Sequence, residues 1–382
     1  MLEIENGLLN KKEKILTDNH AQSKIIVLTG GGTAGHVIPN LALLPYLEQT
    51  FGEIHYIGSE NGIEREILKK YPQIKYHVIP TAKLRRSISP KSLASNIKTP
   101  FIVLSGIRSA KKILRKIKPS IIFSKGGFVA YPVVKAGSSL NIPIILHESD
   151  LSLGLANKLS LKHADFVFTS FEKTAQNLCK KLNPDRVKFT GTPIRNEIFK
   201  GRAEQITKIF SNSKTTSTKK NLLVIGGSLG AGRINAALQN SLQFLDDWNV
   251  LHITGRGKLL KKTSSANYCQ IEYLDNPADA YAWADLVISR AGSGAIFELL
   301  ALNKPTLLIP LSTGRGDQQE NAKEVSSKKL MNVLQEENLT PETLFTAIKN
   351  TYKDFDILQS SMKKHRYPTN AKEIAEKITA II

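Results

Sequence analysis

The chain has 382 residues, of which 41% are hydrophobic and 23% charged, and it carries a formal net charge of +20 at pH 7. This length favours two domains over one, and the composition excludes collagen-like, disordered and disulfide-stabilised proteins. Two cysteines, no apolar segment within residues 1–22 and no apolar run of about 18 residues argue against a secreted or membrane-spanning protein.

Positive charge is concentrated in the first half of the sequence. No acidic residue occurs between Glu66 and Glu148, whereas the same stretch contains 16 lysines and arginines. A solvated surface normally mixes both signs, so this run predicts a polyanionic partner: nucleic acid, anionic lipid headgroups or a phosphorylated substrate. The alternative is a generally basic composition in which the lysines are merely solvated.

Short apolar runs alternate with segments of helical periodicity along the chain. Strands are predicted at 25–29, 54–57, 76–79, 121–124, 144–147, 166–169, 222–225, 250–254, 270–273, 286–289 and 306–309. Apolar strands separated by helices are typical of parallel sheets covered on both faces. The pattern restarts after the polar stretch 211–220, so the sequence predicts an α/β protein of two Rossmann-like, doubly wound domains facing each other across a cleft.

The segment 107–118 has the amphipathic pattern of a helix. Ile107, Ala110 and Leu114 recur at helical spacing, and lysines and arginines occupy the opposite face. We expect a crossover helix that packs on the first sheet and leaves its basic face free.

Two glycine loops follow predicted strands of the first domain. The candidate residues in the first loop, 30–36, are Thr33, Ala34, Gly35 and His36, and those in the second are Gly126, Gly127 and Phe128. Glycine permits close backbone approach, and the free N–H groups of a following helix bind anions. The first loop also matches the G-x-G-x-x-G pattern, which alone leaves a nicotinamide-dependent dehydrogenase open. The second fits a tight turn as well as an anion site.

Three polar loops follow predicted strands of the second domain. Their candidate residues are Ser228 in loop 226–231, Ser293, Gly294, Ala295 and Glu298 in segment 289–298, and Gln318 and Gln319 in segment 316–321. Backbone amides and hydroxyls suit a diphosphate, a carboxylate suits a ribose diol, and carboxamides suit sugar hydroxyls. The helix dipole alone would explain Glu298, and a helix N-cap at Asp317 would explain the last segment.

Several other chemistries lack their sequence patterns. The chain contains no zinc-binding, EF-hand or nucleophile-elbow spacing, no P-loop lysine and no Asp-x-Asp after a strand. The pattern therefore favours a diphosphate site without metal or other cofactor, to which Arg195 at the predicted domain junction contributes a guanidinium.

Eight segments, in order along the chain, resemble the MurG family of bacterial cell-wall glycosyltransferases. They are GGGTAGH at 30–36, SKGGF at 124–128, HESD at 147–150, GLANK at 154–158, GTPIR at 191–195, GGSLGA at 226–231, YAWADLVISRAGSGAIFE at 281–298 and GDQQENA at 316–322. The resemblance implies a GT-B fold and inverting transfer of N-acetylglucosamine from UDP-N-acetylglucosamine to lipid I, which yields lipid II. Residues 1–22 lack the apolar segment of a signal peptide and are predicted to be an N-terminal extension. The resemblance implies an acceptor domain at 23–194, a donor domain at 195–360, and a helix within 361–382 that packs back on the first domain.

The resemblance also implies roles for the candidate residues. Donor contacts are expected from Arg195 and Ser228 at the diphosphate, Leu274 at the uracil, Glu298 at the ribose, Gln318 and Gln319 at the sugar, and from Ser293, Gly294, Ala295 and Thr33 through Gly35. The loops at 30–36 and 126–128 are expected to bind the acceptor diphosphate. Asp150 stands where family members often have Asn, and Phe128 stands where some have Tyr, so those two contacts are altered.

His36 is the first candidate for the general base, because an imidazole at a helix N-terminus is biased toward its neutral form. Glu148 is the second candidate, and acceptor binding or loop structure is the alternative role of His36. The basic and apolar stretch 83–101 predicts contact with anionic lipids. The resemblance implies a lipid-linked acceptor, which places the first domain peripherally on the cytoplasmic side of the cell membrane. No nucleic acid is expected, whereas cell-wall and division proteins are further candidate partners.

Three competing interpretations remain. A diacylglycerol glycosyltransferase would share the fold and the donor site, but segments 147–150 and 154–158 favour the cell-wall enzyme. The repeated glycine loop and the paired glutamines argue against a dehydrogenase. A basic binding protein without catalytic activity would leave the ordered set of glycine loops unexplained.

Overall fold

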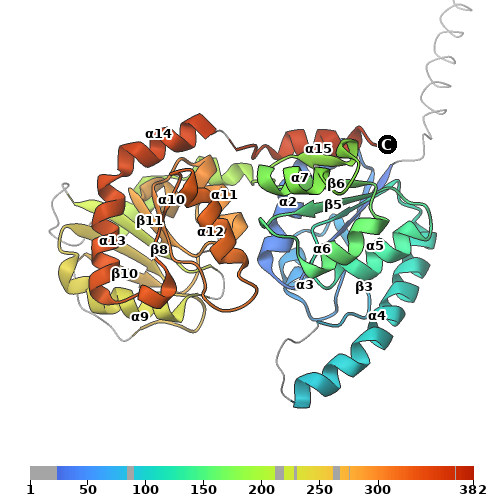
Figure 1. Ribbon diagram of the computed structural model, residues 1–382, viewed down its shortest axis with the longest axis horizontal. Coiled ribbons are helices and arrows are strands. Elements are labelled where there is room, and N and C mark those ends of the chain that lie inside the picture. Colours follow the sequence, from blue (N-terminus) through green and yellow to red (C-terminus); the bar gives the residue numbers. More distant parts are fainter. Residues whose placement is uncertain are drawn as a thin grey trace, which may run out of the picture.

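The computed structural model describes residues 24–83, 90–210, 219–227, 230–260, 267–274, 276–365 and 367–382, with side chains omitted over 90–96. The expected extension at 1–22, residues 84–89 of the predicted lipid-binding stretch 83–101 and the candidate Ser228 lie outside the described residues. Two α/β lobes sit side by side, and the C-terminal segment spans both of them (Figure 1). In the described part of the chain, no helix is long and apolar enough to cross a membrane.

The first lobe contains a seven-stranded parallel sheet in the order β3-β2-β1-β4-β5-β6-β7. Its strands are β1 (Ile25–Thr29), β2 (Glu53–Gly58), β3 (Ile74–Val78), β4 (Ile121–Ser124), β5 (Ile144–Glu148), β6 (Phe166–Thr169) and β7 (Val187–Phe189). Its helices are η1 (Ala34–His36), α2 (Ile38–Leu47), α3 (Ile63–Leu68), α4 (Pro90–Ile117), α5 (Ala130–Ser138), α6 (Leu155–Ser160), η2 (Leu161–His163), α7 (Glu172–Cys179) and η3 (Pro184–Arg186).

The second lobe repeats this plan with a six-stranded parallel sheet in the order β10-β9-β8-β11-β12-β13. Its strands are β8 (Lys220–Ile225), β9 (Trp248–Ile253), β10 (Tyr268–Ile271), β11 (Leu286–Ser289), β12 (Thr306–Leu308) and β13 (Asn332–Val333). Its helices are η4 (Asn196–Lys200), α8 (Ala203–Phe210), α9 (Gly232–Ser241), η5 (Leu242–Phe244), α10 (Ala278–Trp283), α11 (Ser293–Ala301), α12 (Asp317–Ser327), η6 (Glu336–Asn338), α13 (Pro341–Lys353) and α14 (Phe355–His365).

Successive apolar side chains of the central strands pack on opposite faces of each sheet, which explains why helices cover both faces. In β1, Ile26 and Leu28 pack in the core with α2, whereas Val27 packs in the opposite core with α4 and α5. In β8, Leu222 packs with α9 and α13, whereas Leu223 packs with α8, α10 and α11. A strand that is apolar on both faces must be covered twice, which confirms the predicted pair of doubly wound domains.

All eleven predicted strands are present, and four of them (β3, β8, β9 and β10) begin two residues earlier than predicted. The sequence interpretation missed β7 and β13, which are three and two residues long and lie at sheet edges. An edge strand pairs on one side only and can be short, so it lacks the long apolar run that marks a central strand.

The chain returns to the first lobe after α14. Residues 361–365, expected in the returning segment, belong to α14, whose Met362 packs in the core of the second lobe. The return leads into α15 (Ala371–Thr379), whose Ile374 and Ile378 join the core that contains α2. A parallel bridge between Ile194 and Asn370 places the outgoing and returning crossings next to each other.

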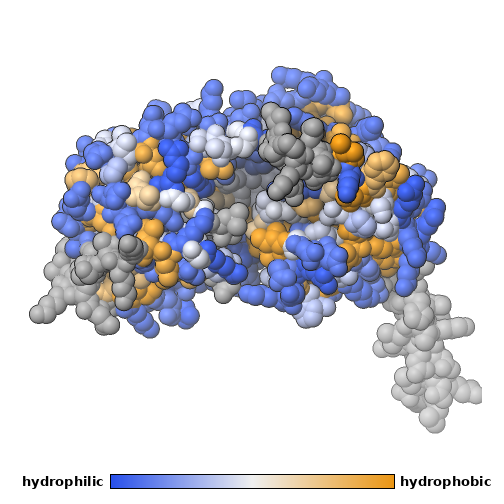
Figure 2. All heavy atoms as spheres, turned by 90° about the horizontal axis from the view of Figure 1, so that it is seen from below, coloured by the Kyte–Doolittle hydropathy of each residue, from blue (hydrophilic) through white to orange (hydrophobic). Residues whose placement is uncertain are grey.

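Helix α4 projects from the first lobe (Figure 1). Ala110 and Leu114 pack against the sheet, as predicted for the amphipathic segment 107–118. Toward its N-terminal end the helix leaves three apolar side chains in solvent: Ile97 is 68% exposed, Phe101 75% and Leu104 44%. Figure 2 shows apolar residues interrupting the hydrophilic surface of the lobe that carries α4.

Candidate active site

The two glycine loops of the first lobe form one surface, because β1 and β4 are neighbours in the sheet. Gly127, at a φ of +80°, lies so close to the first loop that a Cβ on it would come within 2.2 Å of the Gly31 carbonyl oxygen. Gly32, at a φ of +87°, is covered by the Phe128 ring in the same way. Side chains are therefore excluded where the loops meet, which leaves backbone groups to face a ligand.

His36 ends the short helix η1 that follows the first glycine loop. Its ring is half-buried, and its Nδ1 lies 2.9 Å from the Thr33 hydroxyl. Burial lowers the pKa of His36 from 6.5 to about 4, Asp150 opposes that shift, and the positive charges of Lys125 and Arg315 reinforce it. The imidazole is thus neutral near pH 7 and able to accept a proton.

Glu148, the second candidate base, is buried at the end of β5 with three hydrogen-bond donors on its carboxylate. The Asp150 amide donates to Oε1 at 3.0 Å, and the Gly154 amide and Asn157 Nδ2 each donate to Oε2 at 2.9 Å. Burial and the charge of Asp150 raise its pKa, and the hydrogen bonds partly offset that rise. These contacts join the HESD and GLANK segments and occupy the oxygens that a general base would use.

Asp150 contacts the second lobe. Its Oδ1 accepts a hydrogen bond of 3.0 Å from Asn321 Nδ2, and its Oδ2 lies 3.7 Å from Arg315 Nη2. Asn321 is fully buried, and its Oδ1 accepts a hydrogen bond of 2.9 Å from the Leu151 amide. We call this set of contacts the interlobe clasp; it brings the HESD loop against helix α12.

Helix α12 carries both candidate glutamines in its first turn. The Oε1 atom of Gln318 accepts a hydrogen bond of 3.0 Å from the Leu311 amide, which ties the loop after β12 to the helix. Gln319 is half-buried next to it. Because the clasp contacts the same helix at Asn321, the structure brings these carboxamides close to Asp150.

Glu298 lies on α11, one turn after Ser293, Gly294 and Ala295 begin that helix. Its Oε1 is 3.9 Å from Arg195 Nη2, and its Oε2 accepts a hydrogen bond of 3.4 Å from the Tyr281 hydroxyl. Burial raises the pKa of Glu298, and Arg195 and Tyr281 work against the rise. The structure thus brings together two residues that were predicted from segments about 100 positions apart in the sequence.

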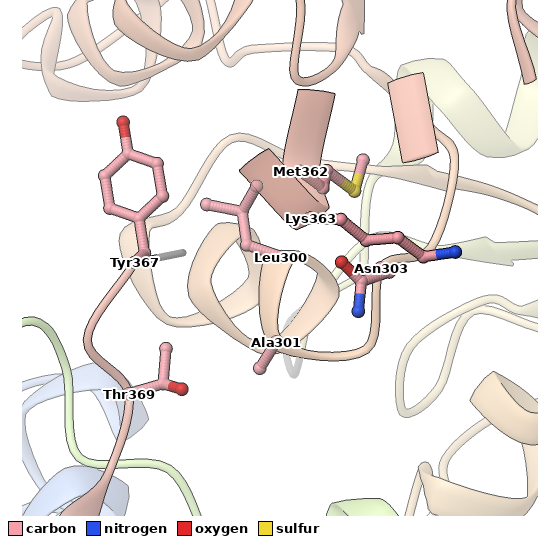
Figure 3. Close-up of a pocket in the computed structure, with 7 residues that line it drawn as sticks. All are labelled: Leu300, Ala301, Asn303, Met362, Lys363, Tyr367 and Thr369. Atoms are coloured by element: carbon pink, nitrogen blue, oxygen red, sulfur yellow. The ribbon is translucent and has the colours of Figure 1, made fainter. Parts of the chain in front are cut away.

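Leu274, the predicted uracil contact, is half-buried against the core of the second lobe. A groove of about 490 Å³ lies elsewhere, between the end of α11 and the segment that returns to the first lobe (Figure 3). Leu300, Met362, Tyr367 and Thr369 are among its lining residues, and none of the predicted site residues lines it. In the described residues, no cluster of three or more His, Cys, Asp or Glu side chains is placed to hold a metal ion.

Sequence reasoning missed the polar groups that support these loops. Glu336 is buried, and its carboxylate accepts hydrogen bonds from Arg290 Nη2 at 2.5 Å, the Ser312 amide at 3.0 Å and the Ser312 hydroxyl at 2.6 Å. Arg290 follows β11 and Ser312 follows β12, so this carboxylate joins two site loops. Nothing in the polar stretch 335–338 indicates that one of its glutamates binds residues as distant in sequence as Arg290 and Ser312.

We predict that Glu336→Gln lowers the free energy of unfolding by about 3 kcal/mol at pH 7, because it breaks a buried ion pair. Burial alone would raise the pKa of Glu336, but Ser312 and Arg290 lower it to about 2. A depressed folded-state pKa stabilises the fold above the unfolded value and loses that contribution as the pH falls toward 2. Urea denaturation should therefore show a difference between wild type and variant at pH 7 that shrinks between pH 4.5 and 2.5. An equal difference at both ends would contradict the assignment.

Comparison with known proteins identifies the family. Residues 26–169 match the glycosyltransferase family 28 N-terminal domain, and residues 221–378 match the C-terminal domain of that family. A UDP-N-acetylglucosamine–N-acetylmuramyl-(pentapeptide) pyrophosphoryl-undecaprenol N-acetylglucosamine transferase of Oceanobacillus iheyensis is 44% identical, over 94% of this chain and 99% of its own length. The transferase of the same name from Clostridium novyi is 43% identical, over 94% of this chain and 97% of its own length.

Solved structures share the fold at lower sequence identity. Acinetobacter baumannii MurG has a TM-score of 0.72 at 24% identity, covering 94% of this chain and 99% of its own. A calicheamicin glycosyltransferase has a TM-score of 0.69 at 14% identity, covering 94% of this chain and 98% of its own. The two matched domains and the relatives above 40% identity lead to one conclusion: the chain belongs to glycosyltransferase family 28 and, within it, to the MurG transferases.

Proposed function

We propose that the chain transfers N-acetylglucosamine from UDP-N-acetylglucosamine to the 4-hydroxyl of N-acetylmuramoyl-pentapeptide on undecaprenyl diphosphate, converting lipid I to lipid II. The observation that carries this proposal is the 44% identity to a transferase of that name over nearly the whole of both chains. The geometry supports it, since both lobes present glycine or polar loops after their strands and the interlobe clasp joins them. The MurG relatives imply the donor and the acceptor together.

The second lobe has the groups that a UDP-sugar requires. Ser293, Gly294 and Ala295 open α11, so their amides lie at the positive end of a helix dipole and suit a diphosphate, with Arg195 nearby. We assign Glu298 to the ribose diol, from which it would accept hydrogen bonds once Arg195 turns toward phosphate. We assign Gln318 and Gln319 to the sugar hydroxyls, Leu274 to the uracil and Ser228 to the diphosphate.

We assign the acceptor to the first lobe. The Gly32 amide donates to Glu64 Oε2 at 3.2 Å, so we assign the acceptor diphosphate to the other backbone amides of the joined glycine loops, with Phe128 over Gly32 as an apolar wall. Thr33 through Gly35 then face the donor. Asp150 is engaged by Asn321 and Arg315, so its proposed role is to hold the lobes together beside the donor sugar.

A single displacement follows from these assignments. The acceptor oxygen attacks C1 of the sugar as the bond from C1 to the UDP oxygen breaks, and His36 takes the proton of the attacking hydroxyl. This role requires the tautomer in which His36 Nδ1–H donates to the Thr33 hydroxyl, 2.9 Å away, because the lone pair of Nε2 is then available. Charge that develops on the departing diphosphate is stabilised by the α11 amides and Arg195. The hydrogen bonds on Glu148 favour His36 over Glu148 as the base.

We also propose that the first lobe docks on anionic lipid through α4. Ile97, Phe101 and Leu104 form an exposed apolar row, with the exposed cations Lys98 and Arg108 beside them. Apolar insertion combined with cationic attraction is how interfacial helices bind membranes. The acceptor is lipid-linked, so such docking would bring the glycine loops to the membrane surface on the cytoplasmic side.

Two acceptors test the function. We expect labelled N-acetylglucosamine to pass from UDP-N-acetylglucosamine to a short-chain lipid I analogue and not to diacylglycerol in a parallel reaction. Product only with diacylglycerol would leave the donor-site assignment intact and would identify the chain as a diacylglycerol glycosyltransferase instead. Tight donor binding without product in either tube would overturn the acceptor assignment alone.

His36→Ala should lower kcat by about 100-fold or more, because general-base catalysis typically contributes that much, while the Kd for UDP changes less than threefold. His365→Ala, an exposed histidine on α14, is the matched control and should behave as wild type. Steady-state kinetics and calorimetric titration with UDP measure the two quantities. A parallel loss of turnover and UDP affinity would rule out His36 as the base.

Removing the apolar row should weaken lipid binding. Ile97→Ser combined with Phe101→Ser should lower partitioning onto vesicles with anionic headgroups by about 10- to 100-fold, from the loss of two buried apolar side chains. Ile357→Ser, which changes a side chain 55% exposed in the second lobe, is the control. Vesicle sedimentation at low and high salt is the measurement. Binding that is insensitive to salt, or unchanged in the double variant, would contradict docking through α4.

A further inference from the structure

Lys125 is a buried lysine that none of the proposed roles uses. It follows β4, directly before the glycines of the acceptor loop, and its residue is only 1% exposed. Among the residues whose burial the structure describes, no other lysine is buried to this degree. The backbone amide of Lys125 donates a hydrogen bond of 2.9 Å to the carbonyl oxygen of Thr29, the residue before the first glycine loop. Lys125 is therefore also anchored next to that loop.

The side chain of Lys125 points to the HESD loop. Its Nζ lies 2.6 Å from His147 Nδ1 and 2.6 Å from the Ser149 hydroxyl oxygen. His147 Nε2 lies 2.8 Å from the Gly191 carbonyl oxygen, which can only accept, so that nitrogen carries the hydrogen. His147 Nδ1 therefore carries no hydrogen and accepts a hydrogen bond. Lys125 thus donates a hydrogen bond to each of the two residues that flank Glu148 in the sequence.

Burying an ammonium in this way is costly. In the described part of the chain, no carboxylate lies within ion-pair distance of Lys125, and Glu148 and Asp150 act on it only at longer range. Burial lowers the pKa of Lys125 to about 7 against the opposing influence of those two carboxylates. A buried charge without an ion-pair partner destabilises the fold, and such groups concentrate at functional sites.

We propose that Lys125 is a positioning residue for the transfer reaction put forward above, on which this inference rests. Its hydrogen bonds to His147 and Ser149 fix the position of segment 147–150 relative to the acceptor loop 125–128. That loop presents Glu148, which organises residues 154–157, and Asp150, which forms the interlobe clasp. Lys125 therefore fixes the acceptor surface and the closing contact with the second lobe as one unit.

Two substitutions separate this role from simple packing. Lys125→Met keeps the approximate volume and removes every donor, whereas Lys125→Gln keeps a donor on a chain one atom shorter. Lys304→Met is the matched control, because Lys304 is a half-buried lysine of the second lobe whose Nζ donates to the Ala284 carbonyl at 2.8 Å. Each full-length variant is compared with wild type in transfer to the lipid I analogue, in the KM for UDP-N-acetylglucosamine and in thermal unfolding.

We expect Lys125→Met to lower kcat by about 10- to 100-fold, the size of a misplacement effect, with the KM for UDP-N-acetylglucosamine within threefold of wild type. Its Tm should be within a few degrees of wild type, because removing a buried charge offsets the lost hydrogen bonds. Lys125→Gln should recover at least threefold of the lost kcat, and Lys304→Met should keep wild-type kinetics. Ser149→Ala should add little to Lys125→Met, because Lys125→Met already removes the hydrogen bond between Lys125 and Ser149.

Three results would overturn the proposal. They are a kcat for Lys125→Met within twofold of wild type, a Lys125→Gln variant no better than Lys125→Met, and a loss of kcat matched by equal losses of donor binding and Tm. A wild-type chain that transfers nothing to the lipid I analogue would overturn the proposed function and this inference together. If the wild type is active and any of the three results is obtained, only the proposed role of Lys125 is overturned.

Discussion

The parallel arrangement of strands is the constraint on which the site depends. In a parallel sheet, every strand ends at the same edge, so loops far apart in the sequence meet there. Loops 30–36 and 125–128 follow the adjacent strands β1 and β4, and segment 147–150 spans the end of the next strand, β5. Segments 290–298 and 310–318 follow β11 and β12. One edge in each lobe thus collects the glycine turns, helix N-termini and polar side chains that a diphosphate and a sugar require. The dehydrogenase interpretation used the same loops and falls with the family assignment.

Buried polar groups hold that edge in place. Glu148, Asn321, Glu336 and Lys125 each join two or more loops by hydrogen bonds from a buried position. Apolar side chains of similar volume would often be as stable or more stable at such positions. Their shared location beneath the loops that follow the strands indicates that they define the geometry of the loops rather than simply add stability. The interlobe clasp extends this arrangement from one lobe to the other.

The sequence predicted the fold well because central strands have long apolar runs and the βαβ pattern repeats. It missed β7 and β13, whose few residues pair at an edge. Glycine motifs identified the loops of the site, since backbone approach demands particular residue types at fixed spacing. It did not identify Lys125, Asn321 or Glu336, whose roles arise from partners that only the folded sheet brings near. Nor could it show that Asp150 contacts the second lobe.

The proposed mechanism depends on the second lobe binding the donor and the first lobe binding the acceptor. Hydrogen–deuterium exchange of the full chain with UDP-N-acetylglucosamine alone tests it most directly, because exchange reports protection segment by segment. We expect slower exchange across segments 290–298 and 316–321, with segment 125–128 unchanged until the lipid I analogue is added. Donor-induced protection of segment 125–128 without protection of segments 290–298 and 316–321 would contradict it.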